Sequence, residues 1–318
     1  MTIDILCATF NGAQFLPDFR ESLEAQTHSD WRLWVRDDGS TDKTVTVVRD
    51  WTRADSRVRL AWAAGQGERL GAARSFGWLL DRTRSDVSYV MFADQDDVWL
   101  PQKITRTFAA MRAAESAYGN GVPLLVHTDL TVTDASLHTV HPSFWTYARI
   151  HPEPTTLRRL ISHNVTTGST VMMNQRLTEL VGRPPAQMAM HDWWCACVAA
   201  AFGRVIALQE STVLYRQHDS NAIGAHDNRM SITEVPRAIA ARAGTSTEFR
   251  RGLSKAAIQA NAFLSRYRDV LNGNDREFLD AYARIPQRGF VRRKVDLLRY
   301  RVLPERGLLH TLGVLWRG

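Results

Sequence analysis

Short apolar runs alternate with amphipathic segments through the first 130 residues of this 318-residue chain, and this alternation restricts the possible folds more than any other feature. The apolar runs have the length and the β-branched or aromatic content of strands: Ile3–Ala8, Trp31–Arg36, Val58–Ala61, Tyr89–Ala93 and Leu124–Thr128. The segments between them space apolar residues three or four apart, as helices do: Phe15–Gln26, Thr41–Trp51, Ala72–Thr83 and Pro101–Tyr118. This order predicts an α/β fold with a mostly parallel central sheet flanked by helices.

The rest of the chain divides into two parts. Beyond Thr155 the pattern is mixed and predicts helices at Leu157–Ser162 and Asp192–Phe202, and strands at Thr170–Asn174, Val205–Leu208 and Val213–Tyr215. From about Glu234 the sequence is helical and rich in arginine, with expected breaks at Gly244, Gly252, Gly273, Pro286 and Pro304. We therefore expect one domain over residues 1–233, in which 131–233 continues the fold begun by 1–130, and a helical basic extension over residues 234–318.

The formal charge of +7 is unevenly distributed. Lys and Arg number 23 against 26 Asp and Glu in residues 1–236, and 17 against 7 in residues 237–318. A nucleic-acid-binding protein needs positive charge at its binding groove, so the slightly acidic first part argues against a nucleic acid partner. The absence of a basic leader and of a run of about 18 apolar residues favours a cytoplasmic protein. Cys7, Cys195 and Cys197 have no metal-ligand spacing and are expected to be buried thiols.

Ligands of such sheets bind beyond the carboxyl ends of the strands, and the second predicted strand ends in a polar turn there. The turn is Asp37–Asp42, with the sequence DDGSTD. It can cap the next helix through Ser40 or Thr41. Alternatively, its carboxylates can accept hydrogen bonds from a nucleotide base or a ribose hydroxyl, because adjacent carboxylates need donors or a cation if they are buried.

The fourth predicted strand ends in three carboxylates within four residues, namely Asp94, Asp96 and Asp97. Like charges this close raise each other's pKa and cost about 1 kcal/mol or more per pair unless a cation neutralises them. Mg²⁺ or Mn²⁺ prefers oxygen ligands and commonly combines one or two carboxylates with phosphate oxygens. We therefore expect a metal site here, and the alternative is a solvated acidic loop beside the helix that starts near Pro101.

Three segments of the first half together resemble the nucleotide-sugar-binding half of family 2 glycosyltransferases, which have the GT-A fold: Thr9–Gly12 (TFNG), Asp37–Asp42 and Asp94–Asp97 (DQDD). Three later segments resemble the rhamnosyltransferase branch of that family: His163–Gly168 (HNVTTG), Met190–Trp194 (MHDWW) and Tyr215–His218 (YRQH). The similarity runs from about Ile3 to Ala225, with the motifs in the order and spacing of the family. It implies that residues 1–130 bind a nucleotide sugar and that residues 131–233 form the acceptor side.

The resemblance also implies roles for single residues on the donor side. Thr9, Asn11 and Asp38 would lie against the donor nucleotide, with Asp38 facing the base. Asp94 would approach the ribose or the metal, and Asp96 would bind the metal beside the diphosphate. The implied cofactor is Mg²⁺ or Mn²⁺.

Asp192 matches the general base of the family, and His218 matches a late histidine that completes the metal site in some relatives. A base that takes the proton of the acceptor hydroxyl typically contributes about 10²–10⁴ in rate, and a metal stabilises the leaving diphosphate. Asp192 can instead cap its helix, and His218 can be an ordinary hydrogen-bonded histidine. A single displacement inverts the anomeric centre, so a β-linked dTDP-L-rhamnose would give an α-L-rhamnoside.

Two tryptophans and an arginine complete the set of candidate binding residues. Trp193 and Trp194 offer flat indole faces to an acceptor sugar, and core packing is the alternative role. Relatives often carry Asn where Arg69 and Ser75 stand, so donor contacts in that loop are in doubt. Arg74, like Arg69, can hold a phosphate or lie on the surface at the entry to a helix.

Residues 289–318 interleave arginines with apolar residues and end in a leucine-rich cluster. Such a helix can lie on an anionic membrane, or it can pack against the catalytic domain with its arginines in water. We expect it to bring the protein to lipid-linked acceptors on the inner face of the cell membrane.

These features predict a metal-dependent inverting glycosyltransferase that uses dTDP-L-rhamnose and a saccharide acceptor of a bacterial surface polysaccharide. One alternative transfers another sugar, such as galactofuranose or glucose, from a UDP donor. A nucleotidyltransferase is the alternative from another class, but it would leave Asp192 without a task.

Overall fold

The computed structural model describes residues 1–62, 69–83, 88–153, 155–218 and 235–289, together with Arg292, Val295, Asp296 and Arg299. For Thr83 and residues 235–250 it describes the backbone alone. The expected boundary between residues 233 and 234 lies next to the undescribed segment 219–234. The expected break at Pro304 and nearly all of the basic segment 289–318 lie outside the described residues.

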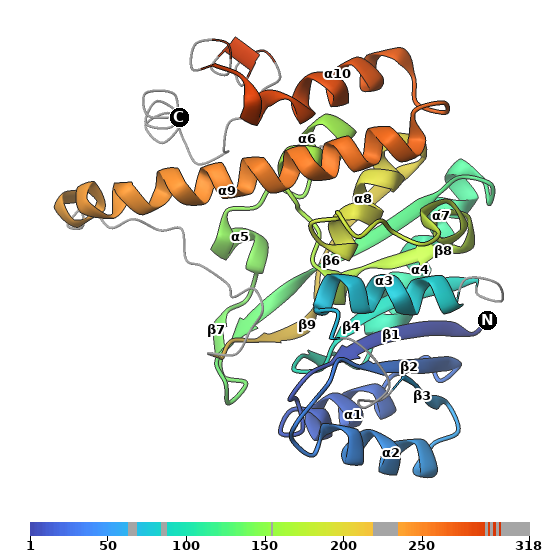
Figure 1. Ribbon diagram of the computed structural model, residues 1–318. Helices are drawn as coiled ribbons and strands as arrows, with labels where there is room; N and C mark the ends of the chain where they lie inside the picture. The colour runs from blue at the N-terminus through green and yellow to red at the C-terminus, as the bar shows by residue number, and fades with distance from the viewer. Residues whose placement is uncertain are drawn as a thin grey trace.

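The strands of the described residues form one mixed sheet (Figure 1). They are β1 (Ile3–Thr9), β2 (Trp31–Asp37), β3 (Val58–Trp62), β4 (Tyr89–Asp94), β5 (Val98–Trp99), β6 (Leu124–Thr133), β7 (Thr139–His141), β8 (Met172–Asn174) and β9 (Arg204–Arg216). The hydrogen-bonded order is β3-β2-β1-β4-β8-β6-β9-β5, and β7 pairs with β6 outside this path. The first four strands in this order are parallel, whereas β8 is antiparallel to both of its neighbours.

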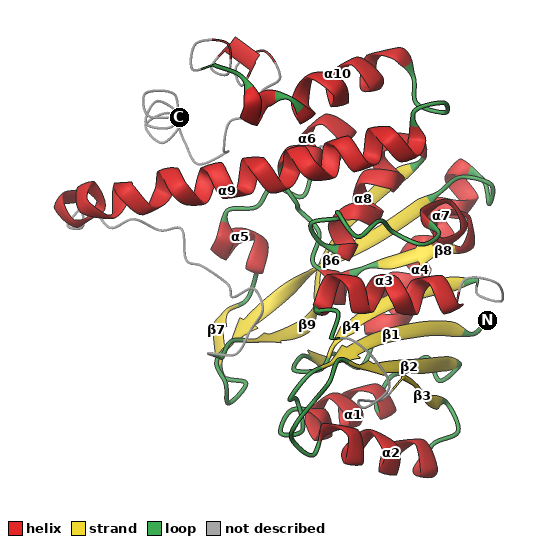
Figure 2. Cartoon of the chain, viewed as in Figure 1, coloured by secondary structure: helices red, strands yellow, loops and turns green. Residues whose placement is uncertain are grey.

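Helices cover both faces of this sheet, as Figure 2 shows. They are α1 (Leu16–Glu24), α2 (Thr44–Ala54), α3 (Ala72–Thr83), α4 (Lys103–Tyr118), α5 (Phe144–Ala148), α6 (Leu157–Ser162), α7 (Gln175–Val181), α8 (His191–Phe202), α9 (Val235–Tyr267) and α10 (Gly273–Ala283), with short 3₁₀ turns η1 (Gly168–Thr170) and η3 (Ile285–Gln287). The predicted α/β class is therefore confirmed. None of the described helices combines the length and apolar character needed to cross a lipid bilayer.

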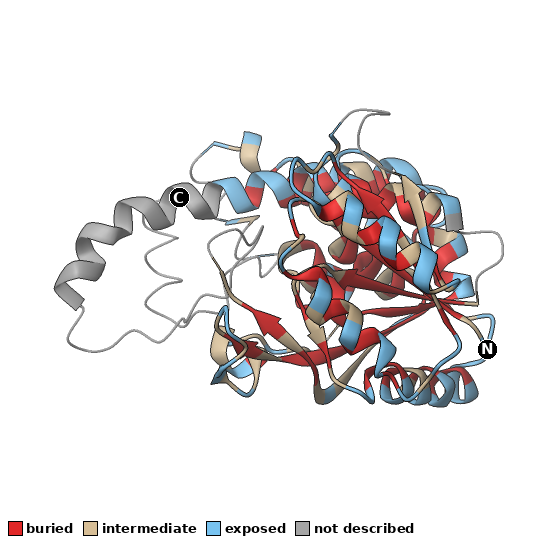
Figure 3. Cartoon of the chain, turned by 90° about the horizontal axis from the view of Figure 1, so that it is seen from below, coloured by how far each residue is buried: buried red, intermediate tan, exposed pale blue. Residues whose placement is uncertain are grey.

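The alternation of side chains along each strand divides the core into two layers. On β1, Ile3, Ile5 and Cys7 pack toward α1, α2 and α4, whereas Leu6 packs toward α3 and α8. Figure 3 shows the resulting arrangement, in which buried residues follow the sheet and exposed residues lie on the outer sides of the helices. The cysteines are free and buried, as predicted.

The register of the parallel strands brings the predicted polar strand ends together. Thr9 at the end of β1 pairs with Asp37 at the end of β2, and Ala8 pairs with Asp94 at the end of β4. Because β1 is the strand between β2 and β4, both acidic strand ends lie at one edge of the sheet. This is the edge at which ligands bind in open α/β sheets.

Three predicted interruptions of regular secondary structure are wrong. The strands predicted at Val205–Leu208 and Val213–Tyr215 form the single strand β9. Strand β6 pairs with β9 along nearly its whole length, and two register shifts in this pairing accommodate the polar residues between the two predicted strands. The expected helix breaks at Gly244 and Gly252 are also absent, because both residues lie inside the continuous helix α9. A helical glycine costs about 1 kcal/mol relative to alanine, which the burial of Leu253, Phe263 and other α9 side chains in the core exceeds.

Gly203, which follows α8, offers a test of the packing between α8 and the sheet. A Cβ atom added at Gly203 would lie 1.8 Å from the carbonyl oxygen of Pro123, whereas a Cβ at Gly252 on α9 would contact nothing within 4 Å. We expect Gly203→Ala to lower the free energy of unfolding by about 1–3 kcal/mol, because backbone must move. Gly252→Ala should raise it by about 0.5–1 kcal/mol. Urea unfolding followed by circular dichroism measures both, and equal changes in the two variants would contradict this packing.

Candidate active site

A cavity of about 600 Å³ opens where the carboxyl ends of β1, β2 and β4 face the beginnings of α3 and α8. The first half of the chain contributes Ala8, Thr9, Phe10, Asp38, Arg69, Gly71, Ala72, Ser75, Phe76, Asp94, Gln95 and Asp96 to its lining. The second half contributes Phe144, Ile150, Asn164, Thr166, Thr167, Gly168, Met190, His191, Asp192 and Tyr215. Residues from both predicted halves therefore form one cavity.

Five of the predicted site residues line this cavity together: Thr9, Asp38, Asp94, Asp96 and Asp192. Their segments are up to about 180 residues apart in the chain, so the tertiary fold alone brings them together. The other predicted site residues do not line the cavity: Asn11, Arg74, Trp193, Trp194 and His218. Their positions are described below.

Asp38 lines the cavity but is already held by three donors. Its oxygens accept the amide N–H groups of Leu70 at 2.8 Å and Gly71 at 2.7 Å. The Arg36 guanidinium, itself buried, donates at 2.5 Å. Burial alone would raise the pKa of Asp38, but these hydrogen bonds lower it below the usual value. Asp38 therefore fixes the loop before α3 against the end of β2. This structural role is independent of any ligand that contacts Asp38 in the cavity.

The acidic end of β4 divides its carboxylates between the cavity and the interior. Asp94 and Asp96 face the cavity, whereas Asp97 is buried outside its lining. Burial raises the pKa of Asp97 well above its usual range, and the neighbouring charges of Asp96 and Asp94 add to this. Lys103 is fully buried too, and burial lowers its pKa to about 7 although the charge of Asp97 opposes that shift. The third carboxylate of the motif thus lies in the interior, where burial favours the uncharged forms of both Asp97 and Lys103.

Asp94 has the chemistry of a cation ligand. Its carboxylate forms no hydrogen bond or ion pair with the described residues. Burial and the charges of Asp96 and Asp192 raise its pKa to about 7. A cation beside it would relieve this repulsion. Across the described ranges, no three His, Cys, Asp or Glu side chains converge closely enough to enclose a metal ion. Asp94 and Asp96 therefore fit a metal that takes other ligands from a bound phosphate group.

His218 is held behind Asp96. Its Nε2 lies 2.9 Å from Asp96 Oδ2, and its ring stacks on Phe15 with 4.4 Å between the ring centroids. The buried Arg216 donates from Nε to the carbonyl oxygen of Asp96 at 3.0 Å and forms an ion pair with Asp18 at 2.5 Å. The YRQH segment thus fixes both the backbone and the side chain of Asp96.

Asp192 lies in the first turn of α8 with 5% of its surface exposed. Its oxygens accept the Trp193 amide at 2.7 Å and the Asn164 side-chain amide at 3.2 Å. Burial raises the pKa of Asp192 to about 6, although these hydrogen bonds oppose the shift. A carboxyl group with this pKa is ionised at neutral pH and is more basic than an exposed one, as a general base must be.

Both tryptophans of the MHDWW segment belong to the interior. Trp194 is fully buried and packs against Phe263 and Tyr267 of α9, so its prediction as an acceptor-binding residue is wrong. Successive residues of a helix point in directions about 100° apart, which turns Trp194 away from Asp192. Trp193 is half-buried outside the cavity lining, and its indole N–H donates to the Leu160 carbonyl oxygen.

Asn11 and Arg74 hold local backbone instead of lining the cavity. Asn11 has a positive φ of 46°, and its side-chain oxygen accepts the Thr41 amide at 2.8 Å, which ties the end of β1 to the DDGSTD turn. Arg74 is exposed on α3 and donates from Nε to the Leu70 carbonyl oxygen at 2.9 Å. Arg69 does line the cavity, with its guanidinium 3.6 Å from the centre of the Phe10 ring.

Sequence reasoning missed the residues that brace the site. Arg36 holds Asp38, and a basic residue inside an apolar strand was a signal for such a buried pair. Gln95 makes two hydrogen bonds to the backbone of Phe10, at 3.0 Å and 2.9 Å, and so joins β1 to β4. A Cβ atom at Gly12 would lie 2.0 Å from Gln95 Oε1, so a larger residue there would displace the Gln95 amide from these hydrogen bonds. No local pattern marks Gln95 and Phe10 as partners, since they are 85 residues apart.

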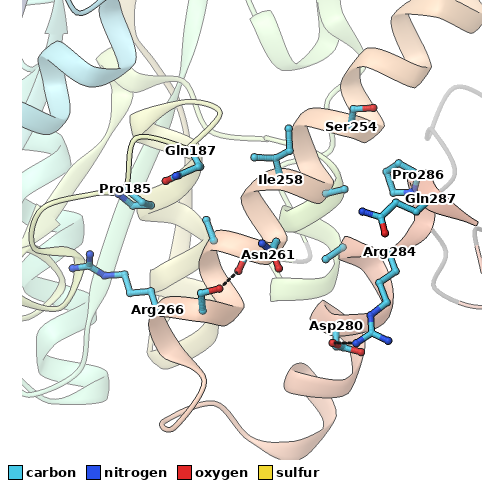
Figure 4. Close-up of a pocket in the computed structure, with 14 residues that line it drawn as sticks. Pro185, Gln187, Ser254, Ile258, Asn261, Arg266, Asp280, Arg284, Pro286 and Gln287 are labelled. Carbon is cyan, nitrogen blue, oxygen red and sulfur yellow. Dashed lines mark hydrogen bonds and ion pairs between the residues drawn. The ribbon is translucent and has the colours of Figure 1, made fainter.

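A second cavity, of about 880 Å³, lies between α9, α10 and the segment 185–187, and Figure 4 shows its lining. Ile258 and Asn261 of α9 face it, and Asp280 and Arg284 of α10 form an ion pair of 2.7 Å at its edge. None of the strand-end carboxylates lines it, so it is separate from the candidate active site.

Comparison with known proteins places this geometry in a family. Residues 4–177, more than half of the chain, match the model of Glycosyl transferase family 2. The putative teichuronic acid biosynthesis glycosyltransferase TuaG of Bacillus subtilis (strain 168) is 24% identical over 182 residues, which cover 57% of this chain and 66% of TuaG. The dTDP-rhamnosyl transferase RfbG of Shigella flexneri is 23% identical over 228 residues, which cover 69% of this chain and 74% of RfbG. The chain thus spans just under two thirds of the length of TuaG.

Solved structures share the fold. S. aureus TarS 1–349 in complex with UDP-GlcNAc has a TM-score of 0.54 at 16% identity, over 96% of this chain and 82% of TarS. The mannosyltransferase PcManGT of Pyrobaculum calidifontis, in complex with GDP-Man and Mn²⁺, has a TM-score of 0.50 at 16% identity, over 99% of this chain and 87% of that one. These likenesses confirm the expected GT-A type α/β fold. With the match over residues 4–177, they show that this chain belongs to glycosyl transferase family 2.

Proposed function

We propose that the protein is an inverting, metal-dependent glycosyltransferase that transfers L-rhamnose from dTDP-L-rhamnose to a saccharide acceptor of a bacterial surface polysaccharide. The observation that carries the proposal is the shared cavity, in which the acidic end of β4 and the buried carboxylate of Asp192 face the same space. The first suits a cation and a leaving diphosphate, and the second suits removal of a proton.

Asp192 performs the acid–base part of this reaction. With a pKa of about 6, it is ionised at neutral pH and accepts the proton of the acceptor hydroxyl as that oxygen attacks the anomeric carbon. Its hydrogen bonds from Trp193 and Asn164 hold the carboxylate in place before the acceptor binds. The attack and the departure of the diphosphate occur on opposite faces of the sugar, so one displacement inverts the anomeric centre.

Asp94 and Asp96 would hold the metal ion, with His218 and Arg216 fixing Asp96. When bound, Mg²⁺ or Mn²⁺ supplies positive charge that stabilises the leaving diphosphate without a proton transfer. The Mn²⁺ in the PcManGT structure supports this expectation for the present chain. Arg69 adds a positive charge to the cavity from the loop before α3.

The choice of L-rhamnose has two supports. RfbG, whose similarity covers 69% of this chain, is named as a dTDP-rhamnosyl transferase. The cavity also carries the apolar side chains Phe76, Ile150 and Met190, against which the methyl group of a 6-deoxy sugar can pack. The alternative donor is a UDP-sugar, because the TarS structure contains UDP-GlcNAc. The surface-polysaccharide role is supported by the name of TuaG, a putative teichuronic acid biosynthesis glycosyltransferase. Contact of residues 289–318 with an anionic membrane is part of the same proposal and rests on their basic and apolar sequence.

A thermal-shift screen of nucleotide sugars tests the donor. With Mn²⁺ present, dTDP-L-rhamnose should raise the melting temperature more than UDP-glucose, UDP-galactose or UDP-GlcNAc, because a ligand at 100 times its Kd stabilises the native state by about 2.7 kcal/mol. Removing the metal with EDTA should remove most of this shift. A larger shift with a UDP-sugar would replace the proposed donor but leave the family unchanged.

Asp192→Asn tests the base. We expect transfer to fall about 10²–10⁴-fold while donor affinity stays within twofold. Wild-type transfer should rise with pH through about 6, because the base must first lose its proton. Asp275→Asn, which removes a carboxylate from the first turn of α10 outside the cavity lining, is the matched control and should be active.

The same variant has a stability signature. Folding raises the pKa of Asp192 from near 3.8 to about 6, so folding favours the protonated form, and ionisation costs stability as the pH rises through this interval. Asp192→Asn should therefore melt at a higher temperature than the wild type at pH 8, with a smaller gain at pH 4.

Normal transfer by Asp192→Asn would refute the assignment of the base.

Asp96→Ala tests the metal site. The variant should lose the Mn²⁺-dependent part of the stabilisation by a nucleoside diphosphate, and transfer should fall at least about 100-fold. Asp50→Ala, on the exposed face of α2, removes the same charge far from the strand ends and should behave as the wild type. Calorimetric titration of Mn²⁺ into the protein with the diphosphate measures the loss, and equal Mn²⁺ binding by Asp96→Ala would contradict the site.

A further inference from the structure

His191 lines the active-site cavity directly beside Asp192, with 3% of its surface exposed. Neither ring nitrogen has a hydrogen-bond partner among the described residues. Buried polar atoms are paired in the large majority of cases, and a neutral imidazole offers one donor and one acceptor. An unpaired imidazole on a cavity wall therefore points to a partner that is part of the bound ligand.

The ring is fixed before any ligand arrives. It stacks on Phe76 with 4.0 Å between the ring centroids and meets the edge of Phe92 at 4.6 Å. A Cβ atom at Gly168 would lie 2.9 Å from Nε2, so glycine at this position gives the imidazole ring the room that it occupies. Burial lowers the pKa of His191 to about 3, and the ring is neutral at working pH.

A second buried histidine shows that unpaired nitrogens alone do not identify a ligand site. His127 on β6 is fully buried, has two unpaired ring nitrogens and packs edge-on against Trp145. It does not line the cavity. His191 differs from it by facing the space that holds Asp192, Asp94 and Asp96.

We propose that His191 is a specificity-determining residue that hydrogen-bonds a hydroxyl group of the transferred sugar. This inference rests on the proposed glycosyl transfer. It adds which part of the donor the protein recognises, namely a hydroxyl group of the sugar. A sugar hydroxyl both donates and accepts, so it can pair with a neutral imidazole in either tautomer. The flanking Phe76 offers an apolar surface to the C–H groups of the sugar ring. A diphosphate is the poorer partner, because a neutral ring carries no charge to match it.

His191→Phe removes both nitrogens but keeps a planar ring between Phe76 and Phe92. We expect its affinity for the nucleotide sugar that best stabilises the wild type to fall about tenfold, as for one lost hydrogen bond with its partner left unpaired. Affinity for the corresponding nucleoside diphosphate should stay within twofold, and KM for the donor should rise more than kcat falls. His127→Phe is the matched control and should change neither affinity. Isothermal titration calorimetry with both ligands measures these values.

Two further variants show which nitrogen acts, because His191→Asn places an amide near the position of Nδ1 and His191→Gln places one near Nε2. Recovery of sugar affinity by one of them supports the inference. Unchanged sugar affinity in His191→Phe overturns it, and an equal loss of nucleoside diphosphate affinity overturns it in favour of a structural role. If the wild type binds none of the nucleotide sugars and transfers no sugar, the proposed function fails as well, which distinguishes that failure from a failure of the inference about His191.

Discussion

The in-register parallel pairing of β1 with β2 and β4 is the constraint on which the active site depends. It places Asp37 and Asp94 beside Thr9 and Ala8 through backbone hydrogen bonds, before any side chain interacts. Carboxylates that repel one another would separate if their segments were free to move. The sheet and its two core layers prevent this, so burial, together with the repulsion from Asp96 and Asp192, raises the pKa of Asp94.

The acidic groups of the site differ in what holds them. Arg36 and two backbone amides hold Asp38, and Arg216 and His218 hold Asp96. Asp94 has no such partner among the described residues, and Asp192 has hydrogen bonds but no cation. Asp38, which is paired with a buried guanidinium, therefore has a structural role. Asp94 and Asp96 are the carboxylates that suit a metal ion, and Asp192 is the one that suits a proton.

The cavity combines this polar wall with an aromatic one. Phe76 lines the cavity and stacks on the neutral ring of His191, and Phe92 contacts the same ring edge-on. A nucleotide sugar has the same division, with a charged diphosphate at one end and a sugar whose faces are C–H groups and hydroxyls at the other. Asp192 lines the same cavity as these polar and aromatic residues, which suits its proposed role as the base.

The sequence by itself determined the features that depend on local patterns. The bounds of α3 and α6, the strands that precede the acidic turns, and Asp94 and Asp96 as cavity residues could be predicted, because periodicity and strand ends are local properties. Asp192 is identified through the resemblance of the MHDWW segment to the family, and it also lines the cavity. The helix periodicity could not decide whether Trp194 faces the substrate or the core, since that depends on where α9 packs.

Only the tertiary structure decided which polar residues bind one another. Gln95 and Phe10 are matched across the sheet, and Asn11 is used by the DDGSTD turn. The continuity of α9 through Gly244 and Gly252 has the same origin, because burial against α8 outweighs the local cost of glycine. In each case the deciding free energy comes from a contact between segments distant in the chain, and a local sequence pattern does not contain it.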